Sequence, residues 1–230
     1  DEQFLYIERR NAAGSNGSPL NRTSEYWIVR LKDGTQYRLG YNEDSEQTVP
    51  TQYQADGCSP CNWQGSWTQG TPACCYGGNT DNVVTFRWRV DDVRDRSNNW
   101  IEYSYVEEVD PNNTDRERAS YLDQIRYNPI PNQGGGFSGA FRTYIDFKRE
   151  NRGQATGYGD EIDDDHQVSD YYYFYQDQFL RSIKISDREG ANYRVIREYL
   201  LKYDELTSTG HDNQTRLLAS VTEYGRDGIS

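Results

Sequence analysis

Apolar and polar residues alternate along most of this chain, whereas apolar residues at helical spacing hardly occur. Strict alternation is the pattern of strands with one buried face. The clearest case runs through residues 27–31 and returns through residues 36–39, with Asp33-Gly34 between them favouring the positive φ angles of a tight hairpin turn. A second predicted strand carries Val84, Phe86, Trp88 and Val90 on one face; it breaks at residues 94–99 and resumes with Ile101, Tyr103 and Tyr105.

Similar segments, each bounded by Gly, Pro, Asn or Asp clusters, predict further strands at Tyr121–Tyr127, Phe141–Lys148, Tyr171–Tyr175, Leu180–Ser186, Tyr193–Tyr203 and Leu217–Tyr224. Together the segments predict an all-β fold, a meander of long antiparallel hairpins. In the longest segment we expect Tyr193, Val195, Tyr199, Leu201 and Tyr203 to share one face. Arg197 interrupts that face, so we expect it to pair with a carboxylate or to stack on a ring.

Three stretches fall outside the predicted strands: residues 11–24, 42–80 and 128–139. The predicted organisation is therefore N-terminal strands with the Asp-Gly hairpin in 1–41, an insertion in 42–82 and a hairpin scaffold in 83–230, with the scaffold continuous with 1–41 as one domain. The insertion is too long to stand as an unstructured loop inside a compact domain. Two disulfides, together with Trp63 and Trp67, would give it a staple and a small core.

All four cysteines lie in that insertion, as Cys58, Cys61, Cys74 and Cys75. An even, clustered number favours two disulfides and an oxidising compartment. The rival interpretation is a zinc site, although the adjacent Cys74 and Cys75 could ligate one ion only with awkward backbone geometry. A thioredoxin-like redox role is weaker still, because no βαβ pattern surrounds Cys58 and Cys61.

Composition narrows the classes of function. The chain has 20 Tyr, 7 Phe and 5 Trp, so its core is expected to consist of amphipathic rings. The net charge of −12 argues against nucleic acid and against an anionic membrane as partners. No segment approaches the roughly 20 apolar residues of a membrane helix, so membrane insertion is not expected. The absence of Met predicts that the chain is a fragment or a processed product of a larger protein.

Several strands also resemble a known family. Residues 26–40 are similar to a hairpin near the start of the shell region of toxin-complex B components and virulence-plasmid B-like proteins. Residues 88–105 resemble the next paired unit of that region, and residues 121–127 the strand after it. Residues 197–203 and 216–228 follow its ending, whereas residues 173–183 form a degenerate YD-type unit. The match to these Rhs/YD-repeat shell proteins is collinear and covers most of the chain, with the cysteine insertion as the main departure.

The resemblance implies a YD-repeat-like strip of β-sheet within a large hollow shell or extended scaffold, which in toxin relatives encloses a separate cargo domain. In that family the strip is structural. We therefore expect a non-catalytic, extracellular segment that builds a shell, stalk or filament. Its expected partners are neighbouring β-repeats of the same or an identical chain, because repeated hairpins gain stability by pairing at their edges.

Candidate chemical sites are few. His166 and His211 lie among polar residues without a nearby nucleophile, so catalysis by either is not expected. Asp160, Asp163 and Asp165 could offer hard oxygens to Ca²⁺, but the order of an EF-type loop is missing and a solvated acidic loop is the better interpretation. Calcium is thus the one candidate cofactor.

Sugar recognition is the main alternative function. Trp63 and Trp67 could stack on sugar rings in a carbohydrate-binding adhesin, and a glycoside hydrolase is a distant third hypothesis because paired carboxylates are abundant in any chain this acidic. Glycans could in turn be carried by the sequons at Asn21, Asn112 and Asn213.

Overall fold

The computed structural model describes residues 5–11, 21–50, 83–110, 113–132, 137–151, 178–203 and 218–226. Its described elements are strands, apart from one short 3-10 turn, which confirms the all-β prediction. Among the described residues no helix is long and apolar enough to cross a membrane.

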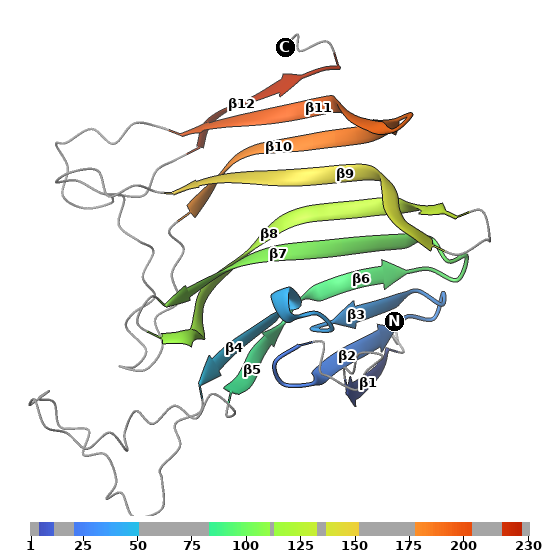
Figure 1. The fold of residues 1–230 in the computed structure, drawn as a ribbon, viewed down its shortest axis with the longest axis vertical. Coiled ribbons are helices and arrows are strands. Elements are labelled where there is room, and N and C mark those ends of the chain that lie inside the picture. Colours follow the sequence, from blue (N-terminus) through green and yellow to red (C-terminus); the bar gives the residue numbers. More distant parts are fainter. Residues whose placement is uncertain are drawn as a thin grey trace, which may run out of the picture.

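Ten strands form one antiparallel sheet in the order β1-β2-β3-β6-β7-β8-β9-β10-β11-β12 (Figure 1). Their bounds are β1 Tyr6–Asn11, β2 Glu25–Arg30, β3 Gln36–Leu39, β6 Val90–Arg94, β7 Trp100–Asp110, β8 Asn113–Pro131, β9 Phe137–Asn151, β10 Gln178–Glu189, β11 Asn192–Tyr203 and β12 Leu218–Tyr224. Apart from the step from β3 to β6, sheet order follows chain order, so the predicted meander is confirmed. β1 and β12 consequently lie at opposite ends of the sheet.

The Asp-Gly hairpin forms as predicted between β2 and β3. Gly34 has a φ of +90°, the left-handed conformation that this position of the turn requires. The turn is closed by Leu31 N–H, which donates to the carbonyl of Thr35 at 2.8 Å, and by Thr35 N–H, which donates to the Asp33 carboxylate at 2.8 Å. Local turn chemistry is therefore sufficient to set this register.

One predicted strand, residues 84–90, is in fact two, because the chain changes partners at Arg89. The Arg89 N–H donates to Ser45 O at 2.7 Å, and the Arg89 carbonyl accepts from Gly40 N–H at 2.9 Å. These bonds direct β5 Val83–Trp88 out of the main sheet to pair with β4 Glu46–Pro50, which follows the 3-10 turn η1 Glu43–Ser45. β4 lies in a stretch expected to be loop. We call β4 and β5 the ribbon.

The face predicted for the longest strand is also wrong in part. A bulge interrupts the pairing of β10 with β11: Ile185 lies opposite Arg197, but Ser186 lies opposite Val195. The extra residue in β11 moves Val195 to the side of the sheet opposite Tyr199. Arg197 does pair with a carboxylate as expected, at 3.0 Å from Glu223.

Other strand boundaries differ by a few residues from the prediction. β8 continues to Pro131 and β9 begins at Phe137, so both enter the stretch of residues 128–139 expected to be loop. The predicted strand Tyr171–Tyr175 lies outside the described residues.

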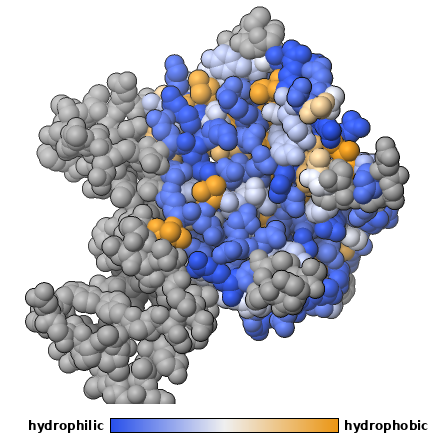
Figure 2. Space-filling view, in the orientation of Figure 1, coloured by the Kyte–Doolittle hydropathy of each residue, from blue (hydrophilic) through white to orange (hydrophobic). Residues whose placement is uncertain are grey.

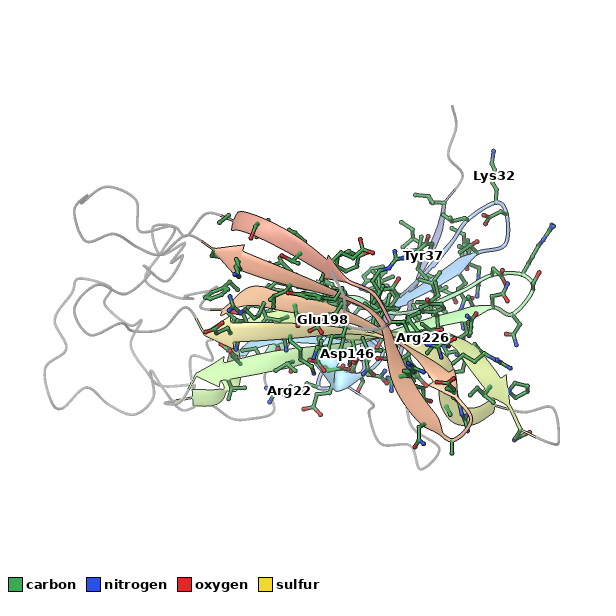
Figure 3. All side chains as sticks on the ribbon, turned by 90° about the horizontal axis from the view of Figure 1, so that it is seen from above. Arg22, Lys32, Tyr37, Asp146, Glu198 and Arg226 are labelled. Atoms are coloured by element: carbon green, nitrogen blue, oxygen red, sulfur yellow. The ribbon has the colours of Figure 1, made fainter. Side chains whose placement is uncertain are left out.

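The hydrophobic core of the described residues is small for a chain of this size. Its buried apolar side chains are Ile28, Ala119, Phe141 and Phe179. The view in Figure 3, turned by 90° from Figure 1, shows why: the strands form a single twisted layer whose two ends fan apart. A single layer cannot bury both of its faces, so the chemistry of each face decides what the sheet can bind.

Candidate functional site

One side of the sheet carries continuous rows of apolar side chains, which we call the apolar face. Residues that lie opposite each other in antiparallel strands point to the same side. The longest row crosses six strands through Ile7, Val29, Tyr37, Val93, Ile101 and Tyr127. Beside it run Tyr103, Ile125, Ile145 and Ile185, and then Phe147, Ile183 and Tyr199. None of these side chains is fully buried, and Ile7 is 58% exposed.

The opposite side carries charges in corresponding rows, and we call it the charged face. One row consists of Glu8, Ile28, Arg38, Asp92, Glu102 and Arg126, and another of Gln124, Asp146, Lys184 and Glu198. Within the first row Asp92 pairs with Arg38 and also lies 3.3 Å from Arg94, and Glu102 lies 3.1 Å from Arg126. Figure 3 labels Asp146 and Glu198 near the middle of the twisted layer.

The charged face is the better covered of the two, because its own long side chains lie across it. The Arg94 guanidinium is 4.1 Å from the centre of the Trp100 ring, and that of Arg126 is 5.7 Å from the Phe141 ring. Phe141 and Asp92, which pairs with Arg38 and Arg94, are each 1% exposed, and Ile28, which lies opposite Arg38, is 3% exposed. Arginine stems thus shield rings and carbons while their heads stay in ion pairs.

The two end strands add apolar surface of their own. Leu5, Tyr6 and Ile7 at β1 are 48%, 54% and 58% exposed, and Leu218 and Val221 in β12 are 51% and 54% exposed. No described strand pairs with the outer edge of either one. Unpaired backbone next to exposed apolar side chains is the usual character of an edge that binds another strand. On the side of the molecule seen in Figure 2, by contrast, hydrophilic side chains predominate and apolar ones form small separate patches.

A shallow depression beside β12 has a volume of about 410 Å³ and is lined by Val195, Glu198, Leu200, Tyr224, Gly225 and Arg226. Its charged groups are engaged elsewhere: Glu198 lies 3.3 Å from Lys184, and Arg226 lies 2.9 Å from Glu189. The depression therefore offers a ligand mainly aliphatic and ring surface.

Acids with raised pKa values gather where the ribbon meets the main sheet. Burial raises the pKa of Glu46 to about 7 and that of Glu107 to about 8, where the neighbouring Glu117 and Asp44 add to the effect. At the base of the ribbon, burial raises the pKa of Asp91 to about 6. Perturbed acids are frequent at functional sites. No group of three or more His, Cys, Asp or Glu in the described ranges has an arrangement that would hold a metal ion.

Most site residues expected from the sequence lie outside the described residues. These are Cys58, Cys61, Cys74, Cys75, Trp63, Trp67, Asp160, Asp163, Asp165, His166, His211, Asn112 and Asn213. Asn21 is described and is 5% exposed. Its Nδ2 donates to Glu25 O at 2.7 Å and to Gly40 O, so a glycan on this nitrogen would have to replace one of these hydrogen bonds.

The fold is similar to the folds of known structures, although the sequence matches no known family. No protein-family model and no curated protein matches the sequence. The structure of the N-terminal domain of effector protein SpvB from Salmonella typhimurium strain LT2 is similar, with a TM-score of 0.58 and 16% identity over 98% of this chain and 66% of that one. The structure of TcdB2-TccC3 is similar with a TM-score of 0.58 and 12% identity, over 100% of this chain and 11% of that one.

Both neighbours are Rhs or toxin-complex proteins. The predicted resemblance is confirmed, and at these identities it establishes the fold. The chain spans 66% of the SpvB domain and 11% of TcdB2-TccC3, so its length corresponds to a part of each.

Proposed function

We propose that this chain is a non-catalytic structural segment of a larger Rhs-like protein, in which it extends a β-sheet wall. The observation that carries the proposal is the contrast between the two faces. The charged face is covered by its own side chains, whereas the apolar rows through Ile101 and Ile145 stay partly exposed across the sheet. Partly exposed apolar surface of this extent gains stability when another layer of protein covers it.

The two end strands supply the second part of the proposal. Backbone pairing at β1 and β12 would continue the sheet on both sides, and exposed Ile7 and Val221 would continue the apolar face into the neighbouring strands. The partners are neighbouring β-repeats of the same or an identical chain. The similarity to an 11% portion of TcdB2-TccC3 supports this proposal, because a fold of this kind occurs there within a much longer chain.

Sedimentation velocity tests the assembly role. We expect the chain to associate with increasing concentration, because its edges and apolar face are open. The double variant Ile7→Lys/Val221→Lys should remain monomeric with an unchanged circular dichroism spectrum, since it places a charge on the apolar face at both ends of the sheet, where a neighbouring strand would continue that face. Thr222→Lys, in the same strand but on the other side of the sheet, is the matched control and should associate as before. A chain that stays monomeric at every concentration, or a double variant that associates normally, would contradict the proposal.

An extracellular location and two disulfides among Cys58, Cys61, Cys74 and Cys75 complete the proposal, on the grounds of cysteine number and clustering. Alkylation of the unreduced protein followed by intact-mass measurement should label none of the four cysteines, and reduction should expose all of them. Labelling without reduction would refute the disulfides, and turnover of any glycoside would refute the non-catalytic role.

A further inference from the structure

The ribbon contacts the main sheet through carboxylates rather than through a backbone ladder. The Glu117 carboxylate of β8 accepts from the N–H of Thr48 at 2.7 Å and from its hydroxyl at 3.0 Å. β7 extends beyond the first residue of β6, and there the N–H of Tyr105 donates to the Asp44 carboxylate at 2.9 Å. Each of these bonds fills a place where a strand would otherwise bond to a neighbouring strand. These bonds favour the ionised carboxylates, whereas burial favours the protonated acids. Burial is the larger effect at both sites, so the pKa values of Asp44 and Glu117 are raised.

A third carboxylate ties the ribbon to the loop before β2. Glu46 in β4 accepts from Thr23 N–H at 3.0 Å and from its hydroxyl at 3.1 Å, and the same hydroxyl lies 2.8 Å from that of Thr85 in β5. Glu46 and Glu117 are each 1% exposed. In addition, Oε1 of Glu107 is buried without a hydrogen-bond partner in the described part of the chain.

The junction carries more acid than base. The charged and titratable groups of the junction itself are Arg22 before β2, Glu43 and Asp44 of η1, Glu46 of β4, Arg89 between β5 and β6, Tyr105 and Glu107 of β7, and Glu117 of β8. Three more charged groups act on members of this cluster: Arg87 of β5 on Arg89, Asp91 of β6 on Tyr105, and Arg126 of β8 on Asp44. Arg22 lies 3.6 Å from Glu117 and 3.5 Å from Glu43. Glu43 is exposed, but ionising Asp44, Glu46, Glu107 and Glu117 together would bury more negative charge than Arg22 and Arg89 can neutralise, which is costly.

On its β5 side, the ribbon leaves the main sheet at a single residue. It joins the main sheet through Arg89, whose neighbours Trp88 and Val90 pair with different sheets. On the ribbon side, the Trp88 ring meets the Trp27 ring of β2 edge to face at 5.8 Å. That contact is not ionisable, so it reports on docking without controlling it.

We propose that the ribbon is a proton-controlled flap, which stays docked on β7 and β8 while the acids at its junction are protonated and lifts away about Arg89 when they ionise. The direction follows from linkage. An acid with a higher pKa in the docked state holds its proton more tightly there, so docking weakens as the pH rises. The loss begins above 4.5, the ordinary value for glutamate, and is complete above about 8, the value for docked Glu107.

Hydrogen exchange of the whole chain, corrected for intrinsic rates, tests the flap at pH 5.5 and pH 8.5. We expect β4 and β5 to lose about tenfold or more of their protection at the higher pH, since one unit of pKa shift corresponds to a factor of ten. Protection of β10 and β11 should not change. The double variant Glu46→Gln/Glu107→Gln should keep the ribbon protected at pH 8.5, and Glu43→Gln, whose side chain is 65% exposed, should behave as the unaltered protein.

Tryptophan emission of the unaltered protein gives a measurement that needs no variant in the junction. Opening of the ribbon separates Trp88 from Trp27, so emission should shift with a midpoint between about pH 6 and 8, and Trp88→Phe should remove the shift. Equal ribbon protection at the two pH values would overturn the proposal. A pH-dependent loss that persists in the double glutamine variant would also overturn it.

Discussion

The two faces of the sheet differ in a way that reverses the usual expectation. Ile28 of the charged face is 3% exposed, and Phe141, whose ring packs against Trp100 and Arg126 of that face, is 1% exposed. Ile101 and Ile145 lie on the apolar face and are only half-buried. Long arginine side chains fold over their own face, but short aliphatic side chains cannot cover theirs. In this single-layer sheet the polar side is therefore covered by its own side chains, whereas the apolar side stays partly exposed.

The largest expected effect compares two phenylalanines of β9: Phe141, whose ring packs against Trp100, Tyr144 and Arg126 of the charged face, and Phe147 of the apolar face. Phe141→Ala should cost about 4 kcal/mol of unfolding free energy, because it empties a buried site between Trp100 and Tyr144. Phe147→Ala should cost less than half as much, since its ring is already partly in water. Urea denaturation measures both. Equal losses would mean that the apolar face is covered within this chain.

A smaller effect is expected from the charged row itself. Asp92→Ala leaves the Arg38 and Arg94 guanidinium groups without their shared carboxylate and should cost about 3 kcal/mol, again by urea denaturation. Asp146→Ala, on the same face but half-buried and bonded to Gln124 at 2.7 Å, is the matched control and should cost about 1 kcal/mol. A cost at Asp92 no greater than that at Asp146 would show that the ion-pair row does not close this face.

The smallest effect is expected toward the C-terminal end of the same face. Lys184→Ala removes an ion pair of 3.3 Å with Glu198, whose two side chains are 39% and 30% exposed. Such pairs contribute about 0–1 kcal/mol, and the contribution should fall further in 1 M salt. A thermal melt at low and high salt checks this. A loss of stability as large as that at Asp92 would mean that the ion pairs act cooperatively along the whole charged face.

Much of this fold can be predicted from the sequence, because the residues that determine its turns and strands are close together along the chain. The Asp33-Gly34 turn needs positive φ, and the strands alternate, so hairpins and their order follow directly. The split at Arg89 could not be predicted, since it depends on bonds to Ser45 and Gly40 from distant parts of the chain. The bulge opposite Ile185 likewise becomes visible only when two strands are in register.

The apolar face and the ribbon junction, for which we propose functions, are harder to predict from the sequence than the fold is. Each apolar row takes one residue from each strand, so its continuity depends on the registers between strands. The junction acids are similarly scattered: Glu46 of β4 bonds to Thr23, and Glu117 of β8 bonds to Thr48 and lies beside Arg22, where β4 docks on β8. Sequence inspection favours dense runs such as Asp160–Asp165, in which the acids are adjacent along the chain. A buried acid cluster assembled from four elements gives no such signal.

Carbene footprinting of the native chain, read by mass spectrometry, tests the central claim most directly because it measures side-chain access without a substitution. Ile125, Ile145 and Ile185 of the apolar face should be labelled readily, whereas Ile28 of the charged face, which is 3% exposed, should be nearly silent. Labelling of the three apolar-face isoleucines as weak as that of Ile28 would contradict an open apolar face and, with it, the proposed role in assembly.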